Sequence, residues 1–222
     1  MTEPLYAVYG ASGCGRGIMP LLREQLRDSL GATFSIEQLV FIDDAPPSTE
    51  VNGHRVLTWE AFLHEPASLR SVALAIANSL VRKKLALRCQ DAGVDVLTVK
   101  ARNVVQMDAV ALGAGALLSP FVTLTSNIVI GKAFHANLYS YVEHDCVIGD
   151  YVTFAPGVQC NGNVHIEDHA YIGAGAVIKQ GTPGAPLVIG RGAVVGMGAV
   201  VTKSVPAGAT VVGNPARLFV KS

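Results

Sequence analysis

A six-residue repeat runs through the second half of the chain and limits the folds that it can adopt. Every sixth residue from Leu112 to Ile178 is apolar. The twelve anchors are Leu112, Leu118, Leu124, Ile130, Ala136, Val142, Ile148, Phe154, Cys160, Ile166, Ile172 and Ile178. A fixed six-residue period is typical of a parallel β-helix, in which three hexads make one triangular coil and the anchors stack inside it. We therefore predict a β-helix from about residue 110.

The repeat is interrupted once and then ends. The step from Ile178 to the next anchor, Ile189, is eleven residues, so one hexad carries five extra residues. We expect the segment "QGTPGAP" to project from the coil as a loop. The tail "VVGNPARLF" is expected to leave the coil, because Pro206 and Pro215 have no backbone N–H to donate to a strand ladder.

The first hundred residues follow a different pattern, in which apolar strands alternate with helices. "LYAVYGASGCGRG" is a short strand running into a Gly-rich turn, and "IMPLLREQLRDSL" has helical spacing. "LVFIDDA" and "SVALAIAN" predict two more strands, and "SLVRKKLALRCQDAG" predicts a second helix. This alternation favours a small parallel sheet. The predicted fold is therefore an α/β domain at residues 1–105 followed by an all-β parallel β-helix at residues 106–222.

Charge and hydropathy disfavour several classes of partner. The 17 Lys and Arg residues balance the 17 Asp and Glu residues, so no net field would attract nucleic acid or an anionic membrane. The apolar runs stop before the roughly 18 residues that a membrane span needs, and "MTEPLYAVYG" does not read as a signal peptide. The four cysteines form no CxxC pair. We expect a cytoplasmic protein with reduced thiols, no nucleic-acid partner and no membrane span.

One turn of the repeat, "VEHDCVIG", carries a cluster of ionisable side chains. His144 stands two residues after its anchor Val142, so its side chain should not point into the core. Histidine is the usual base for acyl transfer to an amine near neutral pH, and Glu143 or Asp145 could hold its tautomer. The residues alone leave open a solvent-exposed turn histidine without a catalytic role.

The other thiols and imidazoles of the repeat are expected to be structural. Cys146 stands four residues after an anchor and Cys160 is itself an anchor, so both should be buried and inert. His135 and His165 are expected to project outward into solvent. His165 and His169 are four residues apart and do not share a face in a coil of period six. We therefore predict no metal site.

The Gly-rich turn of the first half has the form of an anion-binding site. It follows a strand and precedes a helix, whose first backbone amides favour an anion. Its spacing is G-x-x-G-x-G rather than the dinucleotide form. The residues expected to line it are Gly10, Ala11, Ser12, Gly13 and Gly15. Asp43 and Asp44 follow the second strand and Asn78 the third; for these side chains, solvated turn residues are the alternative.

Taken together, "GASGCG", "FIDD", "RKK" and "VEHDCVIGDYV" resemble one branch of the hexapeptide-repeat acyltransferases. That branch holds the bacterial nucleotide-sugar N-acetyltransferases and their sialic-acid O-acetyltransferase relatives, and the resemblance covers essentially the whole chain. It implies a Rossmann-like N-terminal domain, a left-handed coil and a homotrimer. It also implies transfer of an acetyl group from acetyl-CoA to a nucleotide-linked amino sugar. We expect a 4-amino-4,6-dideoxy sugar destined for a surface glycan such as O-antigen.

The resemblance also assigns roles to individual residues. His144 matches the catalytic base and Asp145 the acid that orients it. Asn137 matches an asparagine that contacts the sugar amine, and Glu143 is a further candidate for substrate binding. The Gly-rich turn, Asp43, Asp44 and Asn78 fall where the family holds the nucleotide-sugar. Residues whose backbone is implied to meet acetyl-CoA, in a groove between two subunits, are Gly162, Ala174 and Met197.

Spacing gives independent support to one of these assignments. A coil is about eighteen residues, so Gly162 should stack beside His144 on the neighbouring turn, where the absence of a side chain would admit the thioester. The chain departs from the family at Thr153, where many members carry a second histidine, and at Cys14 and Arg16 of the Gly-rich turn. Two alternatives remain open, a sugar O-acetyltransferase of the sialic-acid type and a non-catalytic nucleotide-sugar-binding module. UDP, dTDP and GDP also remain open as the nucleotide.

Overall fold

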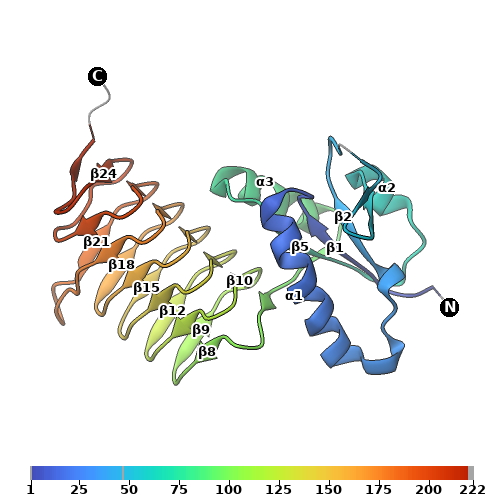
Figure 1. Cartoon of the computed structure of the whole chain (residues 1–222), viewed down its shortest axis with the longest axis horizontal. Coiled ribbons are helices and arrows are strands. Elements are labelled where there is room, and N and C mark those ends of the chain that lie inside the picture. Colours follow the sequence, from blue (N-terminus) through green and yellow to red (C-terminus); the bar gives the residue numbers. More distant parts are fainter. Residues whose placement is uncertain (1, 47, 220–222) are drawn as a thin grey trace. The chain divides into compact units, whose positions relative to one another are not determined.

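The computed structural model describes residues 2–46 and 48–219. The chain divides into two compact units, Met1–Lys100 and Ala101–Ser222. The first unit combines helices with a sheet, and the second is a stack of short strands, coloured from green to red in Figure 1.

The first unit is built on a six-stranded sheet in the order β3-β4-β2-β1-β5-β6. Its strands are β1 (Leu5–Tyr9), β2 (Leu39–Ile42), β3 (Glu50–Val51), β4 (His54–Leu57), β5 (Arg70–Leu74) and β6 (Asp95–Val96). The helices are α1 (Gly13–Leu30), α2 (Trp59–His64) and α3 (Ser79–Asp91), and β7 (Val99–Lys100) ends the unit. Short 3-10 turns span Gly31–Thr33 and Ile36–Gln38. Strand β1 pairs in parallel with β2 and β5, as the alternation of strands and helices predicts.

Glycine explains why helix α1 begins earlier than its apolar spacing predicts. The periodic pattern starts at Ile18, but the helix already begins at Gly13. A Cβ atom on Gly15 would lie 1.7 Å from the carbonyl oxygen of Gly10, so only glycine lets the first turn pack against the end of β1. Gly10 itself has a φ of +104°, a backbone conformation that favours glycine. The Gly-rich segment therefore forms both the connection after β1 and the first turn of helix α1.

The second unit is a parallel β-helix made of three sheets. The first sheet contains β10 (Leu117–Leu118), β13 (His135–Ala136), β16 (Thr153–Phe154), β19 (Tyr171–Ile172), β22 (Val194–Val195) and β24 (Thr210–Val212). The second contains β8 (Val105–Gln106), β11 (Thr123–Leu124), β14 (Tyr141–Val142), β17 (Gln159–Cys160), β20 (Val177–Ile178) and β23 (Val200–Val201). The third contains β9 (Val110–Leu112), β12 (Ile128–Ile130), β15 (Val147–Ile148), β18 (Val164–Ile166) and β21 (Leu187–Ile189).

The pairing register confirms the repeat. Leu124 pairs with Val142, and Val142 pairs with Cys160, so neighbouring strands are eighteen residues apart. The anchors form one core inside the coil, where eleven of them are buried and Leu112 packs against the others. The coil begins at β8, earlier than residue 110, because Val105 and Gln106 already pair with β11.

The interruption of the repeat lies where the sequence predicts it. Ile166 pairs with Ile189, a spacing of 23 residues that leaves five residues outside the regular coil. The prediction for the tail was wrong: Val211 pairs with Val195 on strand β24 and is buried. Pro206 does not stop the ladder, because it lies in the turn before β24, where no strand N–H is needed. After β24 the chain turns back, and β25 (Arg217–Leu218) pairs with β24 in the antiparallel sense.

Outward-facing side chains are not all in solvent, and the prediction for His135 was wrong. Its side chain alternates with those of the anchors, yet it is buried, as are the equivalent Leu117 and Thr153 of the first sheet. His165 of the third sheet is half-buried. A side chain that points out of the coil is therefore not necessarily exposed to solvent. No helix within residues 2–46 and 48–219 has the length and apolar character that crossing a membrane would require.

Candidate active site

His144 lies at one corner of the coil. The turns that follow strands β11, β14, β17, β20 and β23 of the second sheet stack along this edge, which we call the His144 corner. A backbone hydrogen bond from Asn163 N–H to the His144 carbonyl joins two of these turns at 3.0 Å. Glu143 and Asp145 belong to the same turn as His144. The predicted base and both neighbouring carboxylates are thus brought to one place.

His144 and Asp145 form a hydrogen-bonded pair. The distance from His144 Nδ1 to Asp145 Oδ2 is 2.8 Å, and each side chain is about half exposed. A carboxylate can only accept, so Nδ1 carries the proton and donates it to Asp145. The lone pair then lies on Nε2, which is the arrangement that a general base requires. Asp145 has a φ of +59°, a left-handed conformation that aspartate tolerates better than most side chains.

The pair changes the acid–base behaviour of the imidazole. The hydrogen bond to Asp145 raises the pKa of His144 above its usual value of 6.5. Partial desolvation acts in the opposite direction, and the charges of Asp145 and Glu143 add to the rise. Both carboxylates favour the protonated ring. His144 is therefore a stronger base than a free histidine, and it takes up a proton at a higher pH.

Gly162 lies directly beside the imidazole ring, as the eighteen-residue spacing predicts. A Cβ atom at this position would be 2.6 Å from His144 Cε1 and 2.7 Å from Nε2. Any larger residue would therefore displace the ring. The absence of a side chain keeps the backbone of this turn next to the nitrogen that would accept a proton.

The two cysteines near this turn belong to the core. Cys146 and Cys160 are fully buried free thiols, as predicted from their places in the repeat. Contact with Cys146 and burial raise the pKa of the Cys160 thiol well above its usual value. Neither sulfur reaches the surface at which His144 stands. The ionisable groups of this turn that reach solvent are therefore the imidazole and the two carboxylates.

Three other candidates lie at a different corner. Asn137, Ala174 and Met197 stand in turns that follow strands β13, β19 and β22 of the first sheet, whereas His144 follows the second. The side-chain amide of Asn137 donates to the carbonyl of Phe154 at 2.6 Å. Ala174 is exposed, and Met197 is 82% exposed. Within one chain the coil therefore brings Gly162, and not these three residues, to His144.

The candidates of the first unit gather at the carboxyl ends of β1, β2 and β5. Open α/β sheets bind their ligands at this edge. The N–H of Gly10 donates to Ile42 O at 2.7 Å, which joins the Gly-rich turn to the end of β2. The first hydrogen bond of α1 runs from Arg16 N to Ser12 O. The backbone amides of Gly13 and Gly15 come before this first hydrogen bond in the helix, and the Ser12 side chain does not cap them. These groups can therefore face an anion.

The two aspartates after β2 are already held by the protein. Asp43 accepts hydrogen bonds from Ala11 N at 3.2 Å and from Ala45 N at 3.1 Å, so it ties the Gly-rich turn to the second strand. Asp44 Oδ2 accepts from Tyr9 Oη at 2.6 Å and from Arg88 at 3.0 Å. Both carboxylates have defined structural partners, and ligand contacts would have to use their remaining acceptor capacity.

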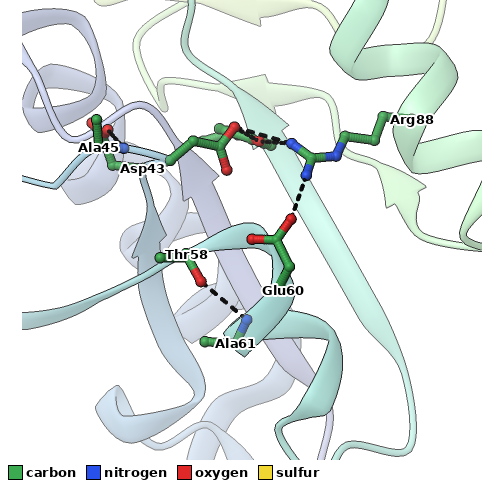
Figure 2. A network of polar contacts seen from close by, with 8 residues as sticks. Asp43, Ala45, Thr58, Glu60, Ala61 and Arg88 are labelled. Carbon is green, nitrogen blue, oxygen red and sulfur yellow. Dashed lines mark hydrogen bonds and ion pairs between the residues drawn. The ribbon is translucent and has the colours of Figure 1, made fainter.

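Arg88 connects Asp44 to a second acid, a contact that sequence reasoning missed. Its guanidinium donates to Glu60 at 2.8 Å and lies 4.9 Å from the centre of the Trp59 ring. Figure 2 shows the contact between Arg88 and Glu60. Only the fold brings these residues from α2 and α3 together. Asn78 caps α3 by accepting from Leu80 N and Val81 N. In the part of the chain that the structure describes, no three His, Cys, Asp or Glu side chains are grouped as metal ligands.

Comparisons with known proteins extend this picture. Residues 163–203 match the family described as the hexapeptide repeat of succinyl-transferase. Over 218 residues, the chain is 52% identical to the GDP-perosamine N-acetyltransferase of Escherichia coli O157:H7. The aligned region covers 98% of this chain and 97% of that protein. The chain belongs to the nucleotide-sugar N-acetyltransferases of the hexapeptide-repeat class.

Solved structures of this class share the fold. WeeI from Acinetobacter baumannii AYE has 61% sequence identity and a TM-score of 0.94, over 98% of this chain and 100% of that one. The acetyltransferase domain of PglB from Neisseria gonorrhoeae FA1090, in complex with acetyl coenzyme A, has 25% identity and a TM-score of 0.84. That likeness covers 98% of this chain and 100% of the PglB domain. Both units are therefore included in the similarity.

Proposed function

We propose that this protein transfers the acetyl group of acetyl-CoA to the amino group of a nucleotide-linked amino sugar, with His144 as the general base. The observation that carries the proposal is the His144–Asp145 pair, at 2.8 Å, packed against a turn that has no side chain at Gly162. Membership of the N-acetyltransferase class supports the reaction, and the pair supplies the group that it needs. No metal takes part in the proposed chemistry.

The proposed reaction is a direct transfer within one ternary complex. The sugar amine attacks the thioester carbonyl carbon while His144 Nε2 accepts the proton that the amine loses. Asp145 stabilises the imidazolium that forms. When the tetrahedral intermediate collapses, the C–S bond breaks, and the CoA sulfur takes the proton back from His144. The products are the acetamido sugar and free CoA. Because the amine attacks the thioester directly, no covalent enzyme intermediate is needed. Binding both substrates in one complex adds the rate advantage of proximity.

The acceptor is proposed to be a 4-amino-4,6-dideoxy sugar on a nucleotide, and GDP-perosamine is the first compound to test. The support is the 52% identity to a protein named as a GDP-perosamine N-acetyltransferase. The nucleotide would lie on the Gly-rich turn of a Rossmann-like sheet, near Ser12 and Asp44. The product would enter synthesis of a surface glycan, and we place the reaction in the cytoplasm.

We further propose a left-handed coil and a homotrimer. Ala174 and Met197 stand at a different corner from His144, so they can share a site with it only if a second copy supplies them. A cyclic assembly would bring the His144 corner of one copy to the Met197 corner of the next. The same contact would place Asn137 of the partner near the acceptor amine.

The test is release of CoA from acetyl-CoA with UDP-, dTDP- and GDP-linked 4-amino-4,6-dideoxy sugars. Turnover with one of them by the wild-type protein, lost in His144→Ala, is the expected result. Release only with hydroxyl acceptors such as sialic acid would identify an O-acetyltransferase. Binding of a nucleotide-sugar without any release would identify a non-catalytic binding module. Both of the latter results contradict the proposal.

A further inference from the structure

A groove farther along the His144 corner contains two lysines that the chemistry at His144 does not use. It has a volume of about 490 Å³ and lies between the loop at residues 180–186 and the turn that follows β23. Both charged side chains in its lining, Lys179 and Lys203, are lysines, and both are exposed. The groove therefore presents positive charge on the same edge of the coil as the candidate base.

The strand register fixes how these lysines are placed relative to His144. Val142 pairs with Cys160, Cys160 with Ile178, and Ile178 with Val201. The residues two positions beyond these four form one column, which consists of His144, Gly162, Gln180 and Lys203. Lys203 thus stands three strand spacings from His144. Neighbouring strands are about 4.8 Å apart, so this separation is about 14 Å.

That separation fits the arm of coenzyme A. About twelve chain bonds join the thioester sulfur to the diphosphate through the pantetheine arm. This is the length of about four extended residues, roughly 13–14 Å. If the thioester lies at His144 and the arm follows the corner, the diphosphate reaches the lysines. Lys179, one position after Ile178, stands a strand closer and extends the positive charge along the same path.

The inserted loop forms a defined wall for this path. Gly181 N–H donates to the carbonyl of Gly162 at 3.0 Å, and Leu187 N–H donates to that of Asn163 at 3.2 Å. Both ends of the insertion are therefore fixed to the turn that lies beside His144. A Cβ atom on Gly181 would be 2.2 Å from Asn163 O, which requires glycine there. Two backbone hydrogen bonds between Thr182 and Ala185 close the loop.

We propose that Lys179 and Lys203 bind the diphosphate of the acyl-CoA donor, and that the loop at residues 180–186 walls the channel for its pantetheine arm. Lysine binds phosphate as a compact positive charge, and charge-assisted contacts of this kind are among the stronger hydrogen bonds. The inference rests on the proposed function, because it takes His144 as the position of the thioester. It assigns the preference for a CoA-linked donor to residues outside the catalytic turn.

The test compares donors that differ only in what lies beyond the pantetheine arm. Acetyl-CoA and acetyl-pantetheine, which lacks the diphosphate, are assayed with wild-type protein, the Lys179→Ala/Lys203→Ala double variant and Lys132→Ala. Lys132 is an exposed lysine after β12 at another corner, so it serves as the matched control. The double variant should raise the KM for acetyl-CoA roughly tenfold and leave kcat within about twofold. Its kinetics with acetyl-pantetheine, and both donors with Lys132→Ala, should be unchanged.

Two further measurements test whether the lysines bind the diphosphate rather than another part of the donor. Acetyl-3′-dephospho-CoA keeps the diphosphate, so the double variant should lose as much affinity for it as for acetyl-CoA. Added salt should weaken acetyl-CoA binding in the wild type more than in the double variant, because exposed charges are screened.

Three results would overturn the inference. They are an unchanged KM for acetyl-CoA in the double variant, an equal loss with acetyl-pantetheine, and disappearance of the effect with acetyl-3′-dephospho-CoA. The last result would assign the lysines to the 3′-phosphate. A wild-type protein that releases no CoA with any acceptor would contradict the proposed function instead. Calorimetric binding of CoA to the wild-type and double-variant proteins would then still decide whether the lysines hold the diphosphate.

Discussion

The His144 corner and the corner that carries Asn137 are built by the same repeat and differ in what their turns present. Both have eighteen-residue register and left-handed residues at equivalent turn positions, Asp145 with φ +59° and Tyr139 with φ +60°. One corner carries an imidazole, carboxylates and two lysines. The other carries a stacked aromatic pair, Phe121 and Tyr139, whose ring centres are 4.8 Å apart. The repeat fixes the backbone, and the turn side chains determine the chemistry.

The largest effect short of removing His144 is expected from Gly162→Ala. The added methyl would overlap Cε1 and Nε2 of the ring, which can swing away, so the protein should fold while the base is displaced. Displacement by about 1 Å can cost roughly a hundredfold in kcat. Steady-state kinetics and the melting temperature check this together. A variant with wild-type kcat would contradict the placement of the base beside this turn.

Mixing two variants that are each inactive alone tests whether the two corners belong to one site. His144→Ala removes the base, and Ala174→Trp blocks the exposed turn at the other corner. If a site forms between copies, mixed trimers contain sites with both corners intact. Random mixing in equal amounts should restore roughly a quarter of wild-type activity, measured after joint refolding. No recovery above the separate variants would contradict a site shared between copies.

A smaller effect is expected from Asp145→Asn. The hydrogen bond to Asp145 raises the pKa of His144, and a protonated imidazole cannot accept the amine proton. Wild-type kcat/KM should therefore fall as the pH drops through this raised pKa. The variant should lose about tenfold in kcat, and its acid limb should move to lower pH. The pH profile of both proteins is the measurement. An acid limb that stays in place would show that Asp145 does not set the basicity.

Much of the coil could be predicted because each feature depends on local spacing. The anchors, the five-residue insertion and the contact of Gly162 with His144 all follow from counting along one period. The last coil could not be predicted in this way. Val195 pairs with Val211, a spacing of sixteen, so two residues are missing, and the count fails there.

The site was harder to predict because corner assignment and tertiary contacts are not local. Asn137 and His144 are only seven residues apart, yet they follow strands of different sheets. Lys203 joins the column of His144 only when the count is carried through the insertion. Arg88 meets Asp44 and Glu60 through packing of α2 and α3, for which the sequence offers no spacing signal. Tertiary contacts of this kind therefore could not be predicted from the sequence.

The most direct test of the account is single-turnover release of CoA by wild-type and His144→Ala proteins with GDP-perosamine and acetyl-CoA. Both substrates are saturating, and CoA binding is measured on the same samples. If His144 is the base, the rate is at least about a hundredfold lower in the variant, with unchanged CoA affinity and melting temperature. An equal rate in the two proteins would contradict the assignment of His144 as the base.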